Sequence, residues 1–299
     1  MSILNRPSDG LFNILVVIVR CLATQGVLHR QKLLDLCAPP SAVESQQRAI
    51  QTLTRWVQLG LLHEDESGAV RLDSAVQSEL RTNGSSANTL ARVIRAFALQ
   101  PANNERFWES ENNGSADFTR AVCWILAQSV FDFDAVGHTD VQQIEVEQLR
   151  DFAAFTNDTR WAGFKSWAVF LGFGWTSRYP KDVFVIDPTK AVRDALPQVF
   201  EGSRELRQSV FFTRLAESLP VVDGGEYRVR IEQKIDRAVW ASAEADQVSS
   251  SLSRALSRLH ESGELILEER ADAEKRSLLG RGSRVTRDVS HMVWKEGEA

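Results

Sequence analysis

Few residues in this chain could build a covalent framework or a metal centre. The 299 residues include three cysteines and five histidines, and none of these has the spacing of zinc ligands. Cys21, Cys37 and Cys123 are odd in number and lie in apolar stretches, which is typical of reduced, buried cysteines in a cytoplasmic protein. We therefore expect no disulfide framework, no bound metal and no other cofactor.

Long apolar runs are missing as well. The run over residues 11–22 is interrupted by Asn13 and Arg20, and it is shorter than the roughly 20 residues that a membrane span requires. No small-residue cleavage site follows the run, so a secretory signal is not expected. The sequence predicts a cytoplasmic protein that does not contact a membrane.

The sequence motifs of common enzymes are also absent. Neither the phosphate loop GxxxxGKS/T nor GxGxxG occurs, and no nucleophile–histidine set can be assembled. Asp223, Glu232 and Lys234 loosely match the pattern of metal-dependent nucleases, which carry such groups on adjacent strands. Residues 231–237 have the pattern of a helix, so we interpret this match as chance and expect no catalytic activity.

What the chain does have is a local concentration of positive charge. The net charge is −5, and the middle of the chain is its most acidic part. The loop over residues 275–287 nevertheless holds five cations, namely Lys275, Arg276, Arg281, Arg284 and Arg287. Such clustering indicates contact with a polyanion better than net charge does. The alternative is a solvated loop that aids solubility, since Asp272, Glu274 and Asp288 partly offset its charge.

The residues around this loop predict a winged helix-turn-helix. A polar helix over 246–261 precedes a strand over 264–268, and a second strand over 289–295 follows the basic loop. In such a module the loop is the wing, whose arginines reach phosphates or the minor groove.

The same helix supplies candidate contacts to bases. Ser250, Arg254 and Arg258 are expected on its outer face, where they would face phosphates and base edges of duplex DNA. An ordinary polar surface helix is the alternative, and the neighbouring basic loop favours DNA.

A second module of this kind is expected over residues 10–75. Three helices (11–24, 30–37 and 41–59) precede two short strands that flank a polar turn at 64–68. Arg48 and Arg55 would lie on the outer face of the third helix, with side chains able to contact DNA. The turn is acidic and would repel phosphate, so we favour contact with a protein for this module and keep DNA contact as the alternative.

The remainder of the chain reads as helical. An aromatic row from Trp161 to Phe173 follows helical spacing, which predicts a hydrophobic core or a docking face rather than a platform for bases. The fold class is therefore mainly α, with winged modules at 1–82 and 223–299 and a helical middle at 83–222. A degenerate third winged helix is expected within 117–200.

The opening segment from Ile3 to Leu15 (ILNRPSDGLFNIL) resembles the start of DpdG proteins. These are accessory components of bacterial gene clusters that place 7-deazaguanine derivatives in DNA and restrict DNA that lacks them. The resemblance implies a role in bacterial defence, beside helicase, ATPase and nuclease partners. It implies no site residues.

These observations predict a non-catalytic, DNA-binding adaptor subunit of a bacterial defence or DNA-processing complex. Its partners would be double-stranded DNA and either other protein subunits or a second copy of the chain. The alternatives are a winged-helix transcriptional regulator, which would bind two half-sites as a symmetric dimer, and a subunit that binds only proteins.

Overall fold

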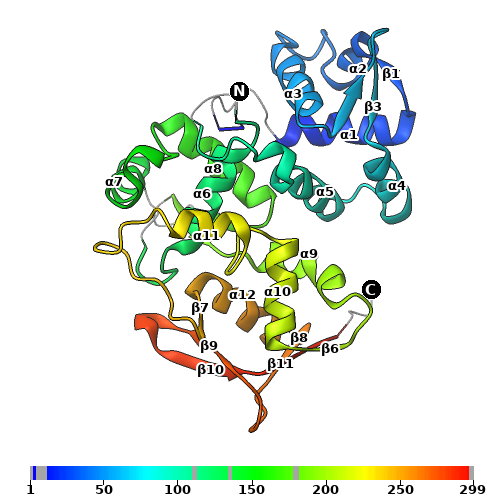
Figure 1. Cartoon of the computed structure of the whole chain (residues 1–299). Coiled ribbons are helices and arrows are strands. Elements are labelled where there is room, and N and C mark those ends of the chain that lie inside the picture. The colour runs from blue at the N-terminus through cyan, green and yellow to red at the C-terminus, as the bar shows by residue number, and fades with distance from the viewer. Residues whose placement is uncertain (1–2, 5–11, 110–112, 134–136, 178–181, 296–299) are drawn as a thin grey trace. The chain divides into compact units, whose positions relative to one another are not determined.

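The computed structural model describes residues 3–4, 12–109, 113–133, 137–177 and 182–295. In these residues the chain forms twelve α-helices and four small sheets, which confirms the mainly α class (Figure 1). The chain divides into two compact units. Unit 1 comprises Met1–Phe118 with Asp158–Leu171, and unit 2 comprises Thr119–Asn157 with Gly172–Ala299. This division differs from the three parts expected at residues 82 and 222, because two helices of the expected middle part, at 87–99 and 158–170, belong to unit 1.

Unit 1 begins with three helices and a small sheet. The elements are α1 (Phe12–Gln25), β1 (Leu28–His29), α2 (Arg30–Cys37), α3 (Gln47–Gln58), β2 (Leu62–Glu64) and β3 (Ala69–Leu72). The strands lie in the order β1-β3-β2 and are antiparallel, with Leu28 opposite Val70 and Leu62 opposite Leu72. Leu62, Val70 and Leu72 are buried, so the sheet turns an apolar row towards the helices. The expected helix over 41–59 begins only at Gln47.

The rest of unit 1 covers this core with further helices. They are α4 (Ser74–Asn83), α5 (Ala87–Leu99), the short η1 (Pro101–Asn103) and α8 (Asp158–Phe170). The aromatic row of α8 packs inward: Trp167 lies 5.5 Å from Trp56, and Phe170 stacks on Phe12 at 4.7 Å between ring centroids. Trp161, Phe164 and Trp167 are buried. The prediction of a hydrophobic core is confirmed for this row.

Unit 2 contains the rest of the chain. Its helices are most of α6 (Ala116–Ala127), α7 (His138–Leu149), α9 (Thr189–Phe200), α10 (Gln208–Ser218), α11 (Glu226–Glu232) and α12 (Ser250–Glu261). Its strands are β4 (Gly174–Ser177), β5 (Val183–Ile186), β6 (Glu205–Arg207), β7 (Gln247–Val248), β8 (Leu265–Glu268), β9 (Arg276–Leu279), β10 (Val285–Val289) and β11 (His291–Trp294). The sheets have the orders β6-β11-β8, β10-β9-β7 and β4-β5.

The sheet β6-β11-β8 follows the same path as the sheet of unit 1. In each unit the chain runs helix, strand, helix, helix, strand and strand, and the first strand pairs with the last. In unit 2 this path begins at Thr189, well before the expected boundary at 223. Residues 219–249 are inserted between its second and third helices, and the hairpin β9–β10 is inserted between β8 and β11. The three-residue strand β6 has only one buried side chain, Leu206, so it leaves little signal in the sequence.

The strands β4 and β5 form a two-stranded antiparallel sheet, with Trp175 opposite Val185. In the described residues no third strand pairs with them. The described part of 117–200 thus contains helices and a two-stranded hairpin, and the third winged module expected there stays a prediction. None of the described helices combines the length and the apolarity that crossing a membrane requires.

Candidate nucleic-acid interface

The basic loop forms an exposed hairpin. Strands β9 and β10 are joined by the short turn η3 (Arg281–Ser283), and all of residues 281–287 are exposed. Gly282 and Ser283 have φ angles of 65° and 56°, in the left-handed region that tight turns use. A Cβ atom at Gly280 would lie 2.5 Å from the Thr286 Cγ2 atom, so the two strands approach closely there. We call residues 281–287 the wing tip.

The five cations of this loop divide into three groups. The side chains of Arg281 and Arg284 have no ion pair or hydrogen bond with any described residue. Arg287, although exposed, donates from its Nη1 atom to Nε2 of His260 at 2.7 Å. The remaining two cations, at the base of the hairpin, are held by other side chains. Two arginines at the wing tip are thus available to an external anion.

The cations at the base are bound within the protein. The Nζ atom of Lys275 lies 2.6 Å from a carboxylate oxygen of Glu269, and this interaction raises the pKa of Lys275. The guanidinium of Arg276 lies over the ring of Phe212, 5.0 Å from its centroid. Neither group is positioned as the free phosphate contact that the loop sequence predicts.

The expected outer face of α12 is covered by other parts of unit 2. Arg254 donates to the carbonyl oxygens of Ile186 at 3.1 Å and Val130 at 3.4 Å. Its guanidinium also lies 5.4 Å from the centroid of the Phe131 ring, and burial lowers the pKa of Arg254. The expectation that Arg254 faces solvent is therefore wrong, because distant backbone carbonyls accept its hydrogen bonds.

The other two candidates on α12 are engaged in the same way. The guanidinium of Arg258 forms an ion pair with Asp187, which precedes α9. The hydroxyl oxygen of Ser250 accepts a hydrogen bond from the Val130 backbone N–H at 3.1 Å. Arg258 nevertheless stays exposed, with 52% of its side chain accessible, as predicted, whereas Ser250 and Arg254 are half-buried.

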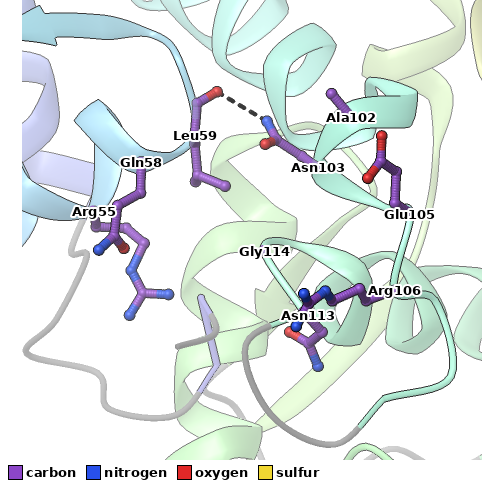
Figure 2. Close-up of a pocket in the computed structure, with 9 residues that line it drawn as sticks. All are labelled: Arg55, Gln58, Leu59, Ala102, Asn103, Glu105, Arg106, Asn113 and Gly114. Atoms are coloured by element: carbon purple, nitrogen blue, oxygen red, sulfur yellow. Dashed lines mark hydrogen bonds between the residues drawn. The ribbon is translucent and has the colours of Figure 1, made fainter.

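The two arginines predicted on α3 lie in different environments. Arg48 is exposed, and its side chain has no ion pair among the described residues. Arg55 is only 3% exposed and lines a pocket of about 300 Å³ in unit 1. Figure 2 shows Arg55 among the residues that line this pocket, which include Asn103, Arg106 and Asn113. The expectation that Arg55 lies on the outer face is wrong, whereas Arg48 does lie there.

Two acidic residues at the turn between β2 and β3 form ion-pair and hydrogen-bond contacts within unit 1. Glu64 pairs with Arg30 at 2.5 Å. The Asp65 carboxylate accepts hydrogen bonds from the Ser67 hydroxyl at 2.6 Å and from the backbone N–H groups of Ser67 and Ala69, which lower the pKa of Asp65. These hydrogen bonds stabilise the charged form of Asp65 and hold the turn in its conformation.

The nuclease-like residues do not converge on a metal position. Asp223 and Glu232 flank the buried guanidinium of Arg228, at 4.0 Å and 2.6 Å. Lys234 lies over the ring of Phe152, 5.3 Å from its centroid. Because an arginine already lies between the two carboxylates, these residues form an ion-pair network. Among the described residues, no group of three or more His, Cys, Asp or Glu side chains could hold a metal ion.

Comparison of the sequence with known proteins gives a match to one protein family. No curated protein and no solved structure matches the chain. A model of the DpdG-like family, however, matches residues 1–273, which include unit 1 and α12 and end just before the basic loop. The match covers far more than the opening segment that first indicated the resemblance. The chain belongs to the DpdG-like family.

Proposed function

We propose that this chain is a DNA-binding adaptor subunit, without catalysis of its own, in a bacterial DNA-defence complex. Membership in the DpdG-like family suggests a role in the Dpd modification system. The shared strand order β1-β3-β2 and β6-β11-β8 supports a winged-helix interpretation of both modules. The observation that carries the DNA-binding proposal is the exposed wing tip, where Arg281 and Arg284 have no internal partner.

The wing tip is the main DNA contact in this proposal, and α12 is not. Phosphate contacts hold a protein on the duplex without reading its sequence, and exposed arginines are well suited to them. Since Arg254 and Arg258 are engaged internally, we expect weak sequence preference in the C-terminal module.

The experiment that tests this proposal is fluorescence anisotropy with a labelled duplex at several salt concentrations. The wild-type protein should bind, and its affinity should fall steeply as salt rises, because bound arginines release counterions from the phosphates. In Arg281→Ala/Arg284→Ala we expect affinity at low salt to fall by about tenfold or more, and the salt slope to decrease by about two.

The matched control is Arg204→Ala/Arg207→Ala, which removes two exposed arginines at β6 and the same total charge. It should bind nearly as the wild type does. Equal losses in both variants would mean that only the overall charge matters, and the wing-tip assignment would then be wrong. Absence of binding even at low salt would identify the protein as a subunit that contacts only proteins.

A further inference from the structure

A groove of about 740 Å³ in unit 2 lies apart from the wing tip. Its walls come from α10, from the inserted segment between α10 and α12, and from the start of β9 (Figure 1). None of residues 281–287 lines it. The groove is therefore a second surface, built largely by the segment that distinguishes this module from the module of unit 1.

The groove is lined by more carboxylates than cations. The carboxylates are Glu217, Asp223, Glu226, Asp246 and Glu274. Glu217, Asp246 and Glu274 are exposed, and their side chains have no ion pair or hydrogen bond with a described residue. The two lining cations, Lys275 and Arg276, are directed to Glu269 and to the Phe212 ring. Arg276 thus places one positive charge in the groove, and Glu217, Asp246 and Glu274 remain without a partner among the described residues.

A buried amide provides a second, independent indication of a ligand. Gln208, the first residue of α10, lines the groove and is only 4% exposed. Its side-chain oxygen has no hydrogen-bond partner among the described residues. A buried acceptor without a donor is destabilising, and such groups usually meet a donor that completes them. Gln208 therefore places a buried acceptor without a partner in the wall of the groove, beside its carboxylates.

Part of the groove lining is apolar, and one lining arginine, Arg276, already lies over it, 5.0 Å from the centroid of the Phe212 ring. Phe212, Ala216 and Pro220 line the groove, and Phe212 is buried. Lysine and arginine side chains have a long aliphatic stem that packs on apolar surface and a charged head that seeks acceptors. Apolar and carboxylate side chains that line one groove match both parts of such a side chain.

We propose that this groove docks a cationic segment, rich in arginine or lysine, of a partner protein. The proposal deepens the adaptor part of the proposed function and rests on it. It assigns DNA to the wing tip and a basic partner segment to the groove, so that one module contacts two partners through separate surfaces.

The test uses the full chain and a labelled synthetic peptide of alternating arginine and serine, with alternating glutamate and serine as the negative control. The variant Glu217→Gln/Asp246→Asn/Glu274→Gln removes the unpaired carboxylates at nearly constant shape. We expect it to bind the basic peptide about tenfold more weakly, as fits three exposed charge pairs. Asp223 is left intact because it accepts hydrogen bonds from the N–H and the hydroxyl of Ser249 before α12, both at 2.6 Å.

The matched control is Glu147→Gln/Asp151→Asn/Glu261→Gln, which removes the same charge from exposed positions of unit 2 outside the groove. It should bind the peptide as the wild type does. A second variant, Gln208→Met, removes the buried acceptor with little change of volume and should weaken peptide binding about threefold. Equal losses in the groove variant and the control variant would overturn the proposal, as would tight binding of the acidic peptide.

Two further measurements separate the outcomes. Circular dichroism of each variant verifies that the fold is retained. Both carboxylate variants should bind duplex DNA alike, so loss of peptide binding with DNA binding intact supports the groove assignment. If the wild type self-associates and the groove variant does not, the occupant is a second copy of the chain, and the proposal of a partner protein is wrong.

Discussion

The modules of units 1 and 2 have the same strand order, yet the helices that precede their hairpins meet different surroundings. Helix α3 in unit 1 leaves Arg48 exposed. Helix α12 in unit 2 directs Arg254 and Arg258 to Ile186, Val130 and Asp187. The comparison teaches that topology alone does not identify a DNA-reading helix. Whether the outer face of the helix is available depends on what the rest of the chain places against it.

The connections between the strands that follow these helices also differ, and here unit 2 has the exposed arginines. In unit 1 the turn is short and acidic, and Asp65 holds it closed. In unit 2 the corresponding connection carries β9, the wing tip and β10, with two unpaired arginines. The exposed arginine of the unit 1 module thus lies on its helix α3, whereas the unpaired arginines of the unit 2 module lie at the wing tip. Three predictions test this contrast, beginning with the largest expected effect.

The first prediction concerns the central strands, which should be equally essential in both modules. Val70 in β3 and Met292 in β11 are fully buried and occupy corresponding places opposite the first strand. Met292→Ala should lower the free energy of unfolding of unit 2 by about 2–5 kcal/mol, through the cavity it leaves. Val70→Ala removes fewer atoms and should cost unit 1 about 1.5 kcal/mol.

Urea unfolding measured by tryptophan fluorescence checks these values. The control is Val285→Ala, whose side chain is 53% exposed and which should change stability by less than about 0.5 kcal/mol. A cost for Met292→Ala as small as that of the control would contradict the role of β11 as the central strand.

The second prediction concerns the two helices, whose arginines should have opposite effects. Arg48→Ala should weaken DNA binding by about fivefold if α3 contacts the duplex, and should leave stability unchanged because the side chain is exposed. Arg254→Ala should leave DNA binding unchanged and lower stability by about 2 kcal/mol, because two carbonyl groups lose a charged donor.

Anisotropy titrations and urea unfolding of both variants provide the test. Loss of DNA affinity in Arg254→Ala without loss of stability would show that α12 becomes uncovered when DNA binds. Unchanged DNA affinity in Arg48→Ala would restrict DNA contact to unit 2 and favour a protein partner for α3.

The third and smallest effect concerns the acidic turn of unit 1. The Ser67 hydroxyl and backbone N–H groups lower the pKa of Asp65 from its ordinary value of 3.8. A carboxylate with a lowered pKa stabilises the folded state above the unfolded value, and this contribution is lost as pH falls through the folded pKa. Asp65→Ala should therefore melt at a lower temperature than the wild type near neutral pH, and the difference should disappear in strong acid.

Thermal melts of both proteins across this pH range give the comparison. Glu66→Ala is the control, because the neighbouring carboxylate accepts no hydrogen bond from a described residue. A difference between Asp65→Ala and the wild type that is independent of pH would mean that the turn does not depend on the charge.

Local patterns in the sequence predicted much of this structure. Helical spacing and the glycine-bounded turns located α1, α2, the hairpin β2–β3 and α12, and the aromatic row of α8 proved to be core. The basic segment was expected as a loop, whereas it contains the strands β9 and β10. These features depend on residues close together in the chain. The family could also be inferred from the opening segment, and the match over residues 1–273 confirms it.

Contacts between distant residues were not predictable in this way. The periodicity of α12 marks the stripe through Leu252, Leu256 and Leu259, but it cannot show that Arg254 meets carbonyl groups 68 and 124 residues away. The burial of Arg55 could not be predicted either, because residues near 103 and 113, far from it in the chain, complete its pocket. Polar side chains signal exposure only when no other segment supplies partners for them.

The inserted segment between α10 and α12 has a thermodynamic consequence. The entropy of closing a loop rises only with the logarithm of its length, by about 0.6 kcal/mol for each doubling. A three-stranded sheet can therefore accept a long connection at a small entropic cost, provided that the strands still meet. Residues 219–249 contribute Pro220, Asp223, Glu226 and Asp246 to a groove on these terms, while β6, β11 and β8 keep their register. New surfaces can be added to this module without altering the pairing that holds it together.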